Sequence, residues 1–442
     1  MSPERQLLLT ADFLLAADLA LLTSFFRLFA GLLLQIVKQF DILYTVKRKE
    51  VKTMKKFFSI ALSLLMIFAL CSVAFAAGTS ADKLTFHEDG TFKILQINDT
   101  QDIEKMNKKT VEFLKKGIAQ EQPDLIVVPG DMLSDMFIGA TPKRIKAALT
   151  ALGTIFNDAK VPFAVTFGNH DHDQEDKVSI KEMMEVFKQF EYCVPQAGTT
   201  EGDPGSYAVP VYSSKDSSKM ALNVYMIDTN NKNGTVTGYS GVYPEQVEWY
   251  KQKSDELKAA NGGEVVPSLL FQHVPVKEIY QFVDRVTYKE AGKACLNIDD
   301  RKWYALNENS GLIGDDNEMG EAPCSEPLDH TTGQYEAWLE KGDIIGAFFA
   351  HDHVNNFMGR TAEGIVLGYN GGTGFRAYGR GDHRSMRVFN INEDDVENYE
   401  THSIYYSDVV GEKFDRYVSD FMTPAIFGDI IRVILRMFFI IK

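Results

Sequence analysis

The 442-residue sequence predicts an α/β (α+β) domain built from layers of strands and helices. Short apolar runs of strand length alternate along the chain with longer segments of helical period. Hydrophobic residues make up 45% of the chain and charged residues 24%, a composition that can form a large core. Polar clusters follow several of the apolar runs directly, as ligand-binding groups do at the carboxyl ends of strands in layered folds.

The predicted elements cover the chain from residue 92 to residue 391. Strands are expected at 92–97, 125–128, 162–166, 221–227, 269–271, 344–349, 365–368 and 386–391. Helices are expected at 104–120, 143–156, 180–190, 244–259 and 332–340. Between 280 and 331 the pattern gives way to Gly, Asp, Asn and Glu, which is typical of a long excursion over a working face.

The first 76 residues differ in kind from the rest. Met54 is followed by two lysines, an apolar run and a small-x-small sequence, so 54–76 is expected to be a bacterial signal peptide. A membrane anchor is the alternative, although the apolar run is short for a span of about 20 residues. We interpret residues 1–53 as a spurious or non-conserved extension, with a membrane-associated segment as the alternative. The protein is therefore expected to be secreted.

The segment 421–442 at the other end is again apolar. Arg432 and Arg436 lie one helical turn apart in it and share a face. A helix in a membrane interface and a helix packed on the domain's own core fit this pattern equally. A helix in the membrane interface would give the secreted protein a peripheral contact with the membrane.

Charge and cysteine content narrow the function classes. The 46 Lys and Arg against 61 Asp and Glu give a net charge of −15, which argues against a nucleic-acid partner. A phosphate-bearing ligand must then be met by local cations such as bound metals.

Cys295 and Cys324 bracket the polar insertion and are expected to form a disulfide. The alternative is that these two and Cys193 are three free thiols.

Five polar segments share one position, directly after a predicted strand. They are Asp99-Thr100-Gln101, Gly130-Asp131, Gly168-Asn169-His170-Asp171, His273 and His351-Asp352-His353. Each segment alone is weak evidence for a functional site, because a Gly-Asp turn or a lone histidine after a strand is usually structural. Together they supply nitrogen and oxygen ligands for two divalent ions. Two ions about 3.5–4 Å apart clamp a phosphoryl group and lower the pKa of a bridging water, producing hydroxide near neutral pH.

This ordered set resembles the calcineurin-like metallophosphoesterases over about residues 90–392. The stretches 350–357, 369–375 and 378–379 are most similar to the branch related to purple acid phosphatases. The resemblance implies a four-layer α/β/β/α sandwich at 82–400 and a dinuclear centre. A small phosphate monoester would be hydrolysed there by a metal-activated hydroxide. A phosphodiesterase or nucleotidase of the same fold, or an impaired protein that only binds a phosphate ligand, are the alternatives.

The resemblance also implies residue roles. It assigns one metal to Asp99, Gln101, Asp131 and His353, and the other to Asp131, Asn169, His273 and His351. His170 would protonate the leaving oxygen or steady the phosphate charge, and Asp171 would orient its ring. The ions are expected to be Mn²⁺, Fe²⁺ or Zn²⁺.

Several residues depart from the family pattern. Gln101 replaces a histidine, so the first metal should be held more weakly and Mn²⁺ should be preferred, with Asp102 as a potential replacement ligand. Ala350 replaces a glycine, and Ser134 stands where purple enzymes have a tyrosine ligand, so no purple colour is expected. Four arginines near the Gly-rich segment 370–374 could bind a substrate oxygen or form a surface basic patch. They are Arg376, Arg380, Arg384 and Arg387.

Overall fold

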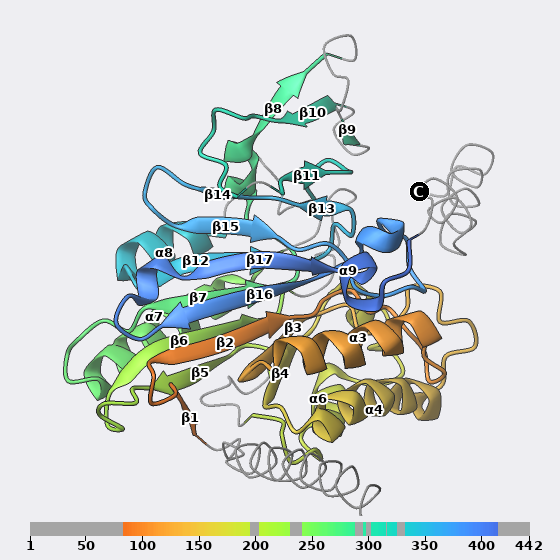
Figure 1. Ribbon diagram of the computed structural model, residues 1–442, viewed down its shortest axis with the longest axis horizontal. Coiled ribbons are helices and arrows are strands. Elements are labelled where there is room, and N and C mark those ends of the chain that lie inside the picture. The colour runs from red at the N-terminus through yellow and green to blue at the C-terminus, as the bar shows by residue number, and fades with distance from the viewer. Residues whose placement is uncertain are drawn as a thin grey trace, which may run out of the picture. The chain divides into compact units, whose positions relative to one another are not determined.

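The computed structural model describes residues 83–194, 203–229, 241–287, 295–297, 302–314, 316–324 and 332–413 (Figure 1). The expectations for 1–53, for the signal peptide at 54–76 and for the helix at 421–442 lie outside the described residues. None of the helices in these ranges combines the length and the apolar composition that crossing a membrane requires.

Two β-sheets form the centre of the fold. One has the strand order β17 (Glu400–Tyr405), β16 (Ser385–Asn392), β2 (Thr91–Gln96), β3 (Leu125–Pro129) and β4 (Phe163–Thr166). The other has the order β1 (Leu84–Thr85), β5 (Tyr207–Tyr212), β6 (Met220–Ile227), β7 (Ser268–Gln272), β12 (Ile344–Phe349), β15 (Val366–Tyr369) and β14 (Met358–Arg360). Strands β2, β3 and β4 run parallel, as do β6, β7, β12 and β15, so their carboxyl ends collect at one edge of each sheet.

Helices cover the outer face of both sheets (Figure 1). On the five-stranded sheet lie α3 (Lys108–Glu121), α4 (Pro142–Ala159) and α6 (Ile180–Phe187). On the seven-stranded sheet lie α7 (Pro244–Ala260) and α8 (Gln334–Lys341). Ring contacts of 5.3 Å join Phe156 of α4 to Phe163 of β4, and Tyr225 of β6 to Tyr250 of α7. A short helix, α9 (Tyr406–Val410), follows β17.

The main apolar core lies between the two sheets. Phe348 of β12 meets Phe389 of β16 with ring centroids 4.6 Å apart. The next residue, Phe349, belongs instead to the second core beneath α7 and α8. Successive side chains of a strand point to opposite faces, so a strand buried on both faces reads as a continuous apolar run. The four-layer α/β/β/α prediction is therefore confirmed.

All eight predicted strands and all five predicted helices are present, and all but β12 have at least one shifted end. Helix α3 starts at Lys108 rather than 104, because the Asn107 side chain accepts the N–H of Lys109 and caps the helix there. Strand β5 is absent from the predicted set, and Pro210, a residue that weakens a strand pattern, lies inside it. Pro210 lies outside the two residues of β5 that pair with β1, so its missing N–H costs no bond to β1.

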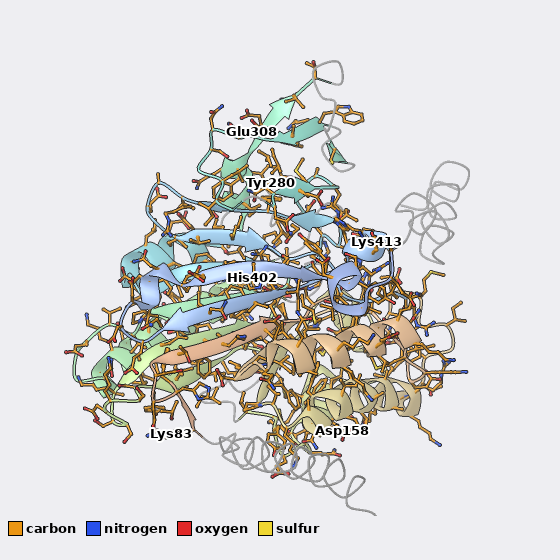
Figure 2. The ribbon with its side chains drawn as sticks, viewed as in Figure 1. Lys83, Asp158, Tyr280, Glu308, His402 and Lys413 are labelled. Atoms are coloured by element: carbon orange, nitrogen blue, oxygen red, sulfur yellow. The ribbon has the colours of Figure 1, made fainter. Side chains whose placement is uncertain are left out.

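The polar excursion predicted between 280 and 331 contains a small sheet of its own. Its strands, which follow a 3₁₀ turn at Lys277–Phe282, have the order β8 (Val283–Val286), β10 (Lys302–Leu306) and β9 (Cys295–Asn297). Tyr280 and Glu308 lie on this insertion (Figure 2). Strand β11 (Glu318–Met319) pairs with β13 (Asn355–Asn356) and ties the insertion back to the main domain.

The predicted Cys295–Cys324 disulfide is wrong. Neither cysteine forms a disulfide in the described part of the chain, and Cys193 forms none there either. The Sγ of Cys295 donates to the carbonyl of Met319 at 3.7 Å. The Cys324 N–H donates to the Asp352 carboxylate at 2.9 Å. The two cysteines thus lie on different segments of the insertion, and bracketing one polar stretch does not bring their sulfurs together.

Candidate metal centre

The predicted site segments come together where parallel strands of the two sheets end. Asp99 and Gln101 follow β2, Asp131 follows β3, and Asn169 follows β4. His273 follows β7 and the pair His351 and His353 follows β12 in the other sheet. Each sheet therefore contributes side chains to the same site, and the site spans the junction between them.

Two groups of potential metal ligands share one carboxylate. Asp131, His273 and His351 form the first group, and Asp99, Asp131 and His353 form the second. Within each group the ligand atoms all lie within 4.8 Å of one another. A carboxylate has two oxygens, so Asp131 can serve both groups at once. This arrangement is a candidate centre for two cations with Asp131 as the bridge.

The backbone is strained where it presents these side chains. Asp99, Gln101, Asp131 and His351 have φ values of 51°, 37°, 50° and 73°. Positive φ is uncommon in residues other than glycine and persists where the surroundings enforce it. Only two other non-glycine residues in the described ranges share it. The strain therefore concentrates on the predicted ligands.

Gly130 and Gly168 allow the strands' ends to approach each other closely. Gly130 has a φ of 93°, and a Cβ there would lie 2.5 Å from the backbone nitrogen of Gly168. A Cβ on Gly168 would lie 2.2 Å from Asp131 Oδ1. Any side chain at either position would push Asp131 away from the loop of Asn169.

Gly130→Ala is expected to destabilise the protein and to displace Asp131. The positive φ alone costs about 1–3 kcal/mol, and the contact with the Gly168 backbone adds to this cost. Gly364→Ala is the matched control, because Gly364 has a φ of 97° and a Cβ there would meet nothing within 4 Å. Denaturant unfolding should give a larger loss for Gly130→Ala. Equal losses would show that the close approach is unimportant.

The centre carries buried negative charge that calls for cations. Asp99 and Asp131 are 0% and 1% exposed. Burial alone would raise the pKa of Asp131, but the charges of His273 and His170 outweigh it and hold that pKa below its usual range. Burial also lowers the pKa of His273, yet Asp131 raises it to about 9. In the described part of the chain Asp99 Oδ1 has no hydrogen-bond partner. Divalent ions would replace the protons on the histidines, so these residues fit a dinuclear centre.

Outer contacts hold the imidazoles in one orientation. His273 Nδ1 donates to the Pro129 carbonyl at 3.0 Å, and His353 Nδ1 donates to the Tyr378 carbonyl at 2.8 Å. The ring of Tyr378 also stacks on His353 at 4.1 Å. With Nδ1 engaged, the Nε2 of each ring is left for the centre. Tyr378 lies in the stretch 378–379 that the resemblance includes, but nothing in the sequence indicates that its ring stacks on a ligand.

The two amide residues lie beside the groups of ligands. Asn169 Oδ1 is 3.2 Å from His273 Nε2. The amide nitrogen of Gln101 is 3.0 Å from Asp131 Oδ2 and 3.2 Å from His353 Nε2. Gln101 therefore occupies the predicted position, and a half-turn of its amide would present the oxygen instead.

The predicted pairing of Asp171 with His170 is wrong. The Asp171 carboxylate accepts the backbone N–H groups of Gly168 at 3.0 Å, Met132 at 3.1 Å and Leu133 at 2.9 Å. The carboxylate at the His170 ring is that of Asp173, with 2.8 Å between Nδ1 and Oδ2. Residues 169–172 form one helical turn, α5 (Asn169–His172), which brings residues three apart together and turns Asp171 inwards.

Asp102 does not reach the centre as a replacement ligand. Its Oδ1 pairs with Arg376 Nε at 2.6 Å, and its Oδ2 accepts the N–H of Asn107. Two of the four predicted arginines thus have acidic partners, because Arg376 pairs with Asp102 and Arg380 pairs with Glu318 at 2.6 Å.

The other two arginines of the predicted set are buried. Arg384 is 2% exposed and Arg387 is 3% exposed. Arg384 donates to the carbonyl of Ala377 and Arg387 to the side chain of Asn356, both inside the fold. The expectation of a surface basic patch is therefore wrong for these two, which brace the segments behind the centre.

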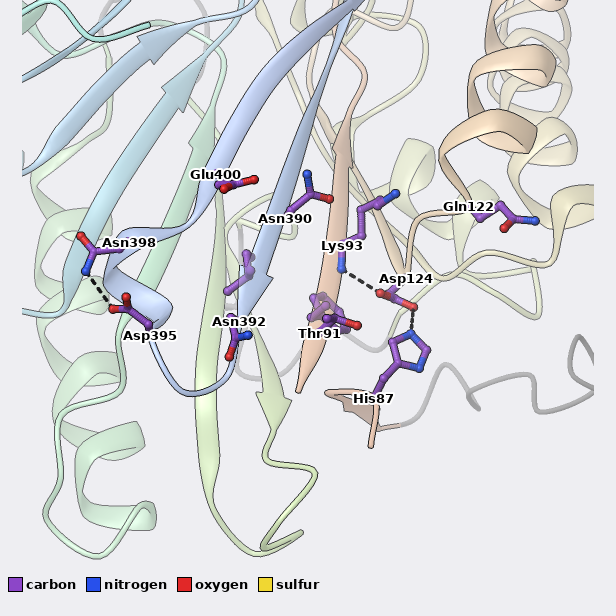
Figure 3. Close-up of a pocket in the computed structure, with 12 residues that line it drawn as sticks. His87, Thr91, Lys93, Gln122, Asp124, Asn390, Asn392, Asp395, Asn398 and Glu400 are labelled. Atoms are coloured by element: carbon purple, nitrogen blue, oxygen red, sulfur yellow. Dashed lines mark hydrogen bonds and ion pairs between the residues drawn. The ribbon is translucent and has the colours of Figure 1, made fainter. Parts of the chain in front are cut away.

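A cavity of about 600 Å³ lies elsewhere, where β2 and β3 begin (Figure 3). Asp124 lies in its wall and joins three segments, accepting the N–H of Lys93 at 2.7 Å and pairing with His87 Nε2 at 2.6 Å. None of the predicted site residues lines this cavity. The cavity lies where β2 and β3 begin, whereas Asp99, Gln101 and Asp131 lie just beyond the points where these strands end.

The family of the chain follows from its sequence as well as its site. Residues 92–355 match the profile of the calcineurin-like phosphoesterases, and the chain belongs to this family.

Relatives of the chain include a "Probable inactive purple acid phosphatase 29" from Arabidopsis thaliana. It is 26% identical over 352 residues, which cover 72% of this chain and 81% of that protein. "Phosphatase DCR2" from Saccharomyces cerevisiae is 24% identical over 353 residues, 73% of this chain and 55% of that protein. Among solved structures, a dimetal phosphatase from Danio rerio matches 72% of this chain and 99% of its own, with a TM-score of 0.39 and 12% identity.

Proposed function

We propose that this chain is a dinuclear metal-dependent phosphoesterase that hydrolyses small phosphate monoesters. The observation that carries the proposal is the single carboxylate of Asp131, which is common to two groups of ligands and lies beside His170. Membership of the calcineurin-like phosphoesterase family supports the reaction class. The choice of monoesters over diesters or nucleotides rests on the resemblance to purple acid phosphatases.

Two divalent ions would be held by the groups that share Asp131, with Asn169 and Gln101 alongside. When bound, such ions supply Lewis acidity to the phosphoryl group and lower the pKa of a water between them. The protein keeps Asp131 in place through the backbone N–H of His170, which donates to its Oδ1 at 2.8 Å.

His170 is the residue that can move a proton. Its Nε2 lies 3.9 Å from Asp131 Oδ2, so this edge of the ring faces the centre. Burial lowers the pKa of His170, but the charge of Asp131 and the contact with Asp173 raise it to about 8. The ring is then protonated near neutral pH, and Nε2 can hold a proton for the leaving oxygen.

A second candidate function is a binding protein with impaired chemistry. Gln101 favours it, because its amide nitrogen donates to Asp131 where the family pattern has an imidazole ligand. The Arabidopsis thaliana relatives that bear the word "inactive" in their names favour it too. Against it stand the complete groups around Asp131 and the presence of His170.

Metal removal tests the proposal. Treatment with a chelator should abolish hydrolysis of an aryl phosphate monoester, and Mn²⁺ should restore it at least as well as Zn²⁺, because an amide oxygen at Gln101 suits Mn²⁺ better than Zn²⁺. The measurement is turnover together with metal content per chain, over a panel that includes a diester and a nucleotide.

Gln101→His is the matched variant, since it restores the ligand of the family pattern and should shift the preference towards Zn²⁺. Two bound metals without turnover of any substrate would favour the binding protein. Full turnover in the metal-free protein would refute the metal-dependent class.

We propose further that the protein acts outside the bacterial cytoplasm and contacts membranes only peripherally. The support for export is the signal-peptide pattern at 54–76, and the support for membrane contact is the apolar and basic segment at 421–442. Both proposals rest on the sequence alone.

A further inference from the structure

We propose that Asp173 is the positioning residue of His170: its carboxylate accepts a hydrogen bond from Nδ1 and so holds the ring with Nε2 facing the centre. The inference rests on the proposed function and names a residue that acts on the reaction through another. It reassigns to Asp173 the role that the resemblance implied for Asp171.

The geometry of α5 brings the two side chains together. Asp173 follows the helix, and its backbone N–H donates to the carbonyl of Asn169 at 2.9 Å, so the helical turn continues through it. Residues three apart lie on the same face of such a turn. Asp173 Oδ2 consequently lies 2.8 Å from His170 Nδ1.

This contact determines the orientation of the His170 ring. An ionised carboxylate can only accept, so Nδ1 of His170 must carry the hydrogen. The other nitrogen, Nε2, lies on the opposite edge of the ring and is the atom 3.9 Å from Asp131 Oδ2. A ring turned by 180° about its Cβ–Cγ bond would lose the bond to Asp173 and direct carbon to the centre. Asp173 therefore fixes the orientation of the ring.

The neighbouring side chains of the turn have other partners. Asp171 is engaged by three backbone N–H groups of the loops after β3 and β4. His172 reaches across to the end of β6, where its Nε2 lies 2.8 Å from Asp228 Oδ1. The side chains of that pair are 7% and 2% exposed.

The buried pair of His172 and Asp228 anchors α5 independently of any metal. Burial lowers the pKa of His172, but Asp228 raises it to about 11, so the His172 ring is protonated at neutral pH. The turn is thereby fixed from one side while Asp171 holds it from the other. Asp173 is left at the exposed side, 47% exposed, facing a His170 side chain that is 19% exposed.

Asp173→Ala is expected to lower kcat by about 10- to 100-fold for an alkyl phosphate, whose leaving oxygen needs a proton. The loss should be much smaller for an aryl phosphate with a good leaving group, and KM and the metal content should not change. Asp173→Asn keeps an acceptor for Nδ1 and should retain most of the activity.

Asp176→Ala is the matched control, because Asp176 lies in the same loop, is 70% exposed and pairs only with its neighbour Lys177 among the ion pairs found. If Asp173→Ala behaves like Asp176→Ala, the inference is wrong. It is equally wrong if Asp173→Ala loses metal, or if its effect is the same for good and poor leaving groups.

Nitrogen NMR of the His170 ring gives a reading that does not depend on turnover. The wild type should show a protonated Nδ1 in a strong hydrogen bond, and this signature should disappear in Asp173→Ala but not in Asp176→Ala. If the wild type shows this signature and hydrolyses nothing, the proposed function fails while the positioning by Asp173 stands. If the signature is missing in the wild type, the positioning fails whatever the activity.

Discussion

Asp131→Asn is expected to abolish hydrolysis and to remove both metals together. Asp131 is the residue common to both groups of ligands, and it is 1% exposed. Its Oδ2 lies 3.2 Å from His273 Nε2 and 3.0 Å from the amide nitrogen of Gln101. An asparagine there removes the shared negative charge and places an amide N–H₂ against either a backbone donor or a side-chain donor. Turnover should fall by about 10³-fold or more.

The measurement is metal content per chain together with turnover. Asp124→Asn is the matched control, because Asp124 lies just before β3 as Asp131 lies just after it. Asp124 binds His87 and the backbone of Lys93 near the remote cavity, so its replacement should change stability but not metal content. An Asp131→Asn protein that still holds two metals would contradict the bridging role.

The strands were predictable because a strand buried on both faces reads as a continuous apolar run, whereas the four-layer arrangement was implied by the resemblance to the family. Phe348 and Phe349 point into different cores, so β12 reads as an unbroken apolar run that ends directly before the site. The convergence of His273 and His351 with Asp131 follows from the ends of parallel strands. Strand β5 is missing from the predicted strands, and it contains Pro210, a residue typical of edge strands and loops.

The contacts made by side chains outside the ligand set were not predictable. Asp171 follows His170 directly, and nothing in the sequence shows that residues 169–172 turn helically and bring Asp173 to the ring instead. Arg384 and Arg387 are charged and were expected near the surface, yet carbonyl and amide oxygens inside the fold satisfy their guanidinium groups. The Asp173 pairing depends on a local helical turn and the arginine contacts depend on tertiary distances, and sequence spacing shows neither.

Asp131→Asn and His170→Ala should both lose activity, but for different reasons, because Asp131 is a predicted metal ligand and His170 a predicted proton donor. Asp131 belongs to both groups of ligands, while His170 binds Asp131 through its backbone N–H at 2.8 Å and directs its ring nitrogen Nε2 to it from 3.9 Å. The backbone contact survives any replacement of the His170 side chain except proline. Loss of the imidazole should therefore leave the centre assembled.

His170→Ala is accordingly expected to keep about two metals per chain and to lower turnover by about 10²–10⁴-fold, the usual effect of removing a positioned acid or base. The loss should shrink for esters with good leaving groups, which need little protonation, so a series of aryl phosphates separates a proton donor from a residue that steadies the phosphate. His402→Ala on β17 is the control, because His402 pairs across the sheet with Val388 and lies outside the groups around Asp131. If His170→Ala loses metal as Asp131→Asn does, His170 belongs to the ligand set. The same result would remove the basis for Asp173 as its positioning residue.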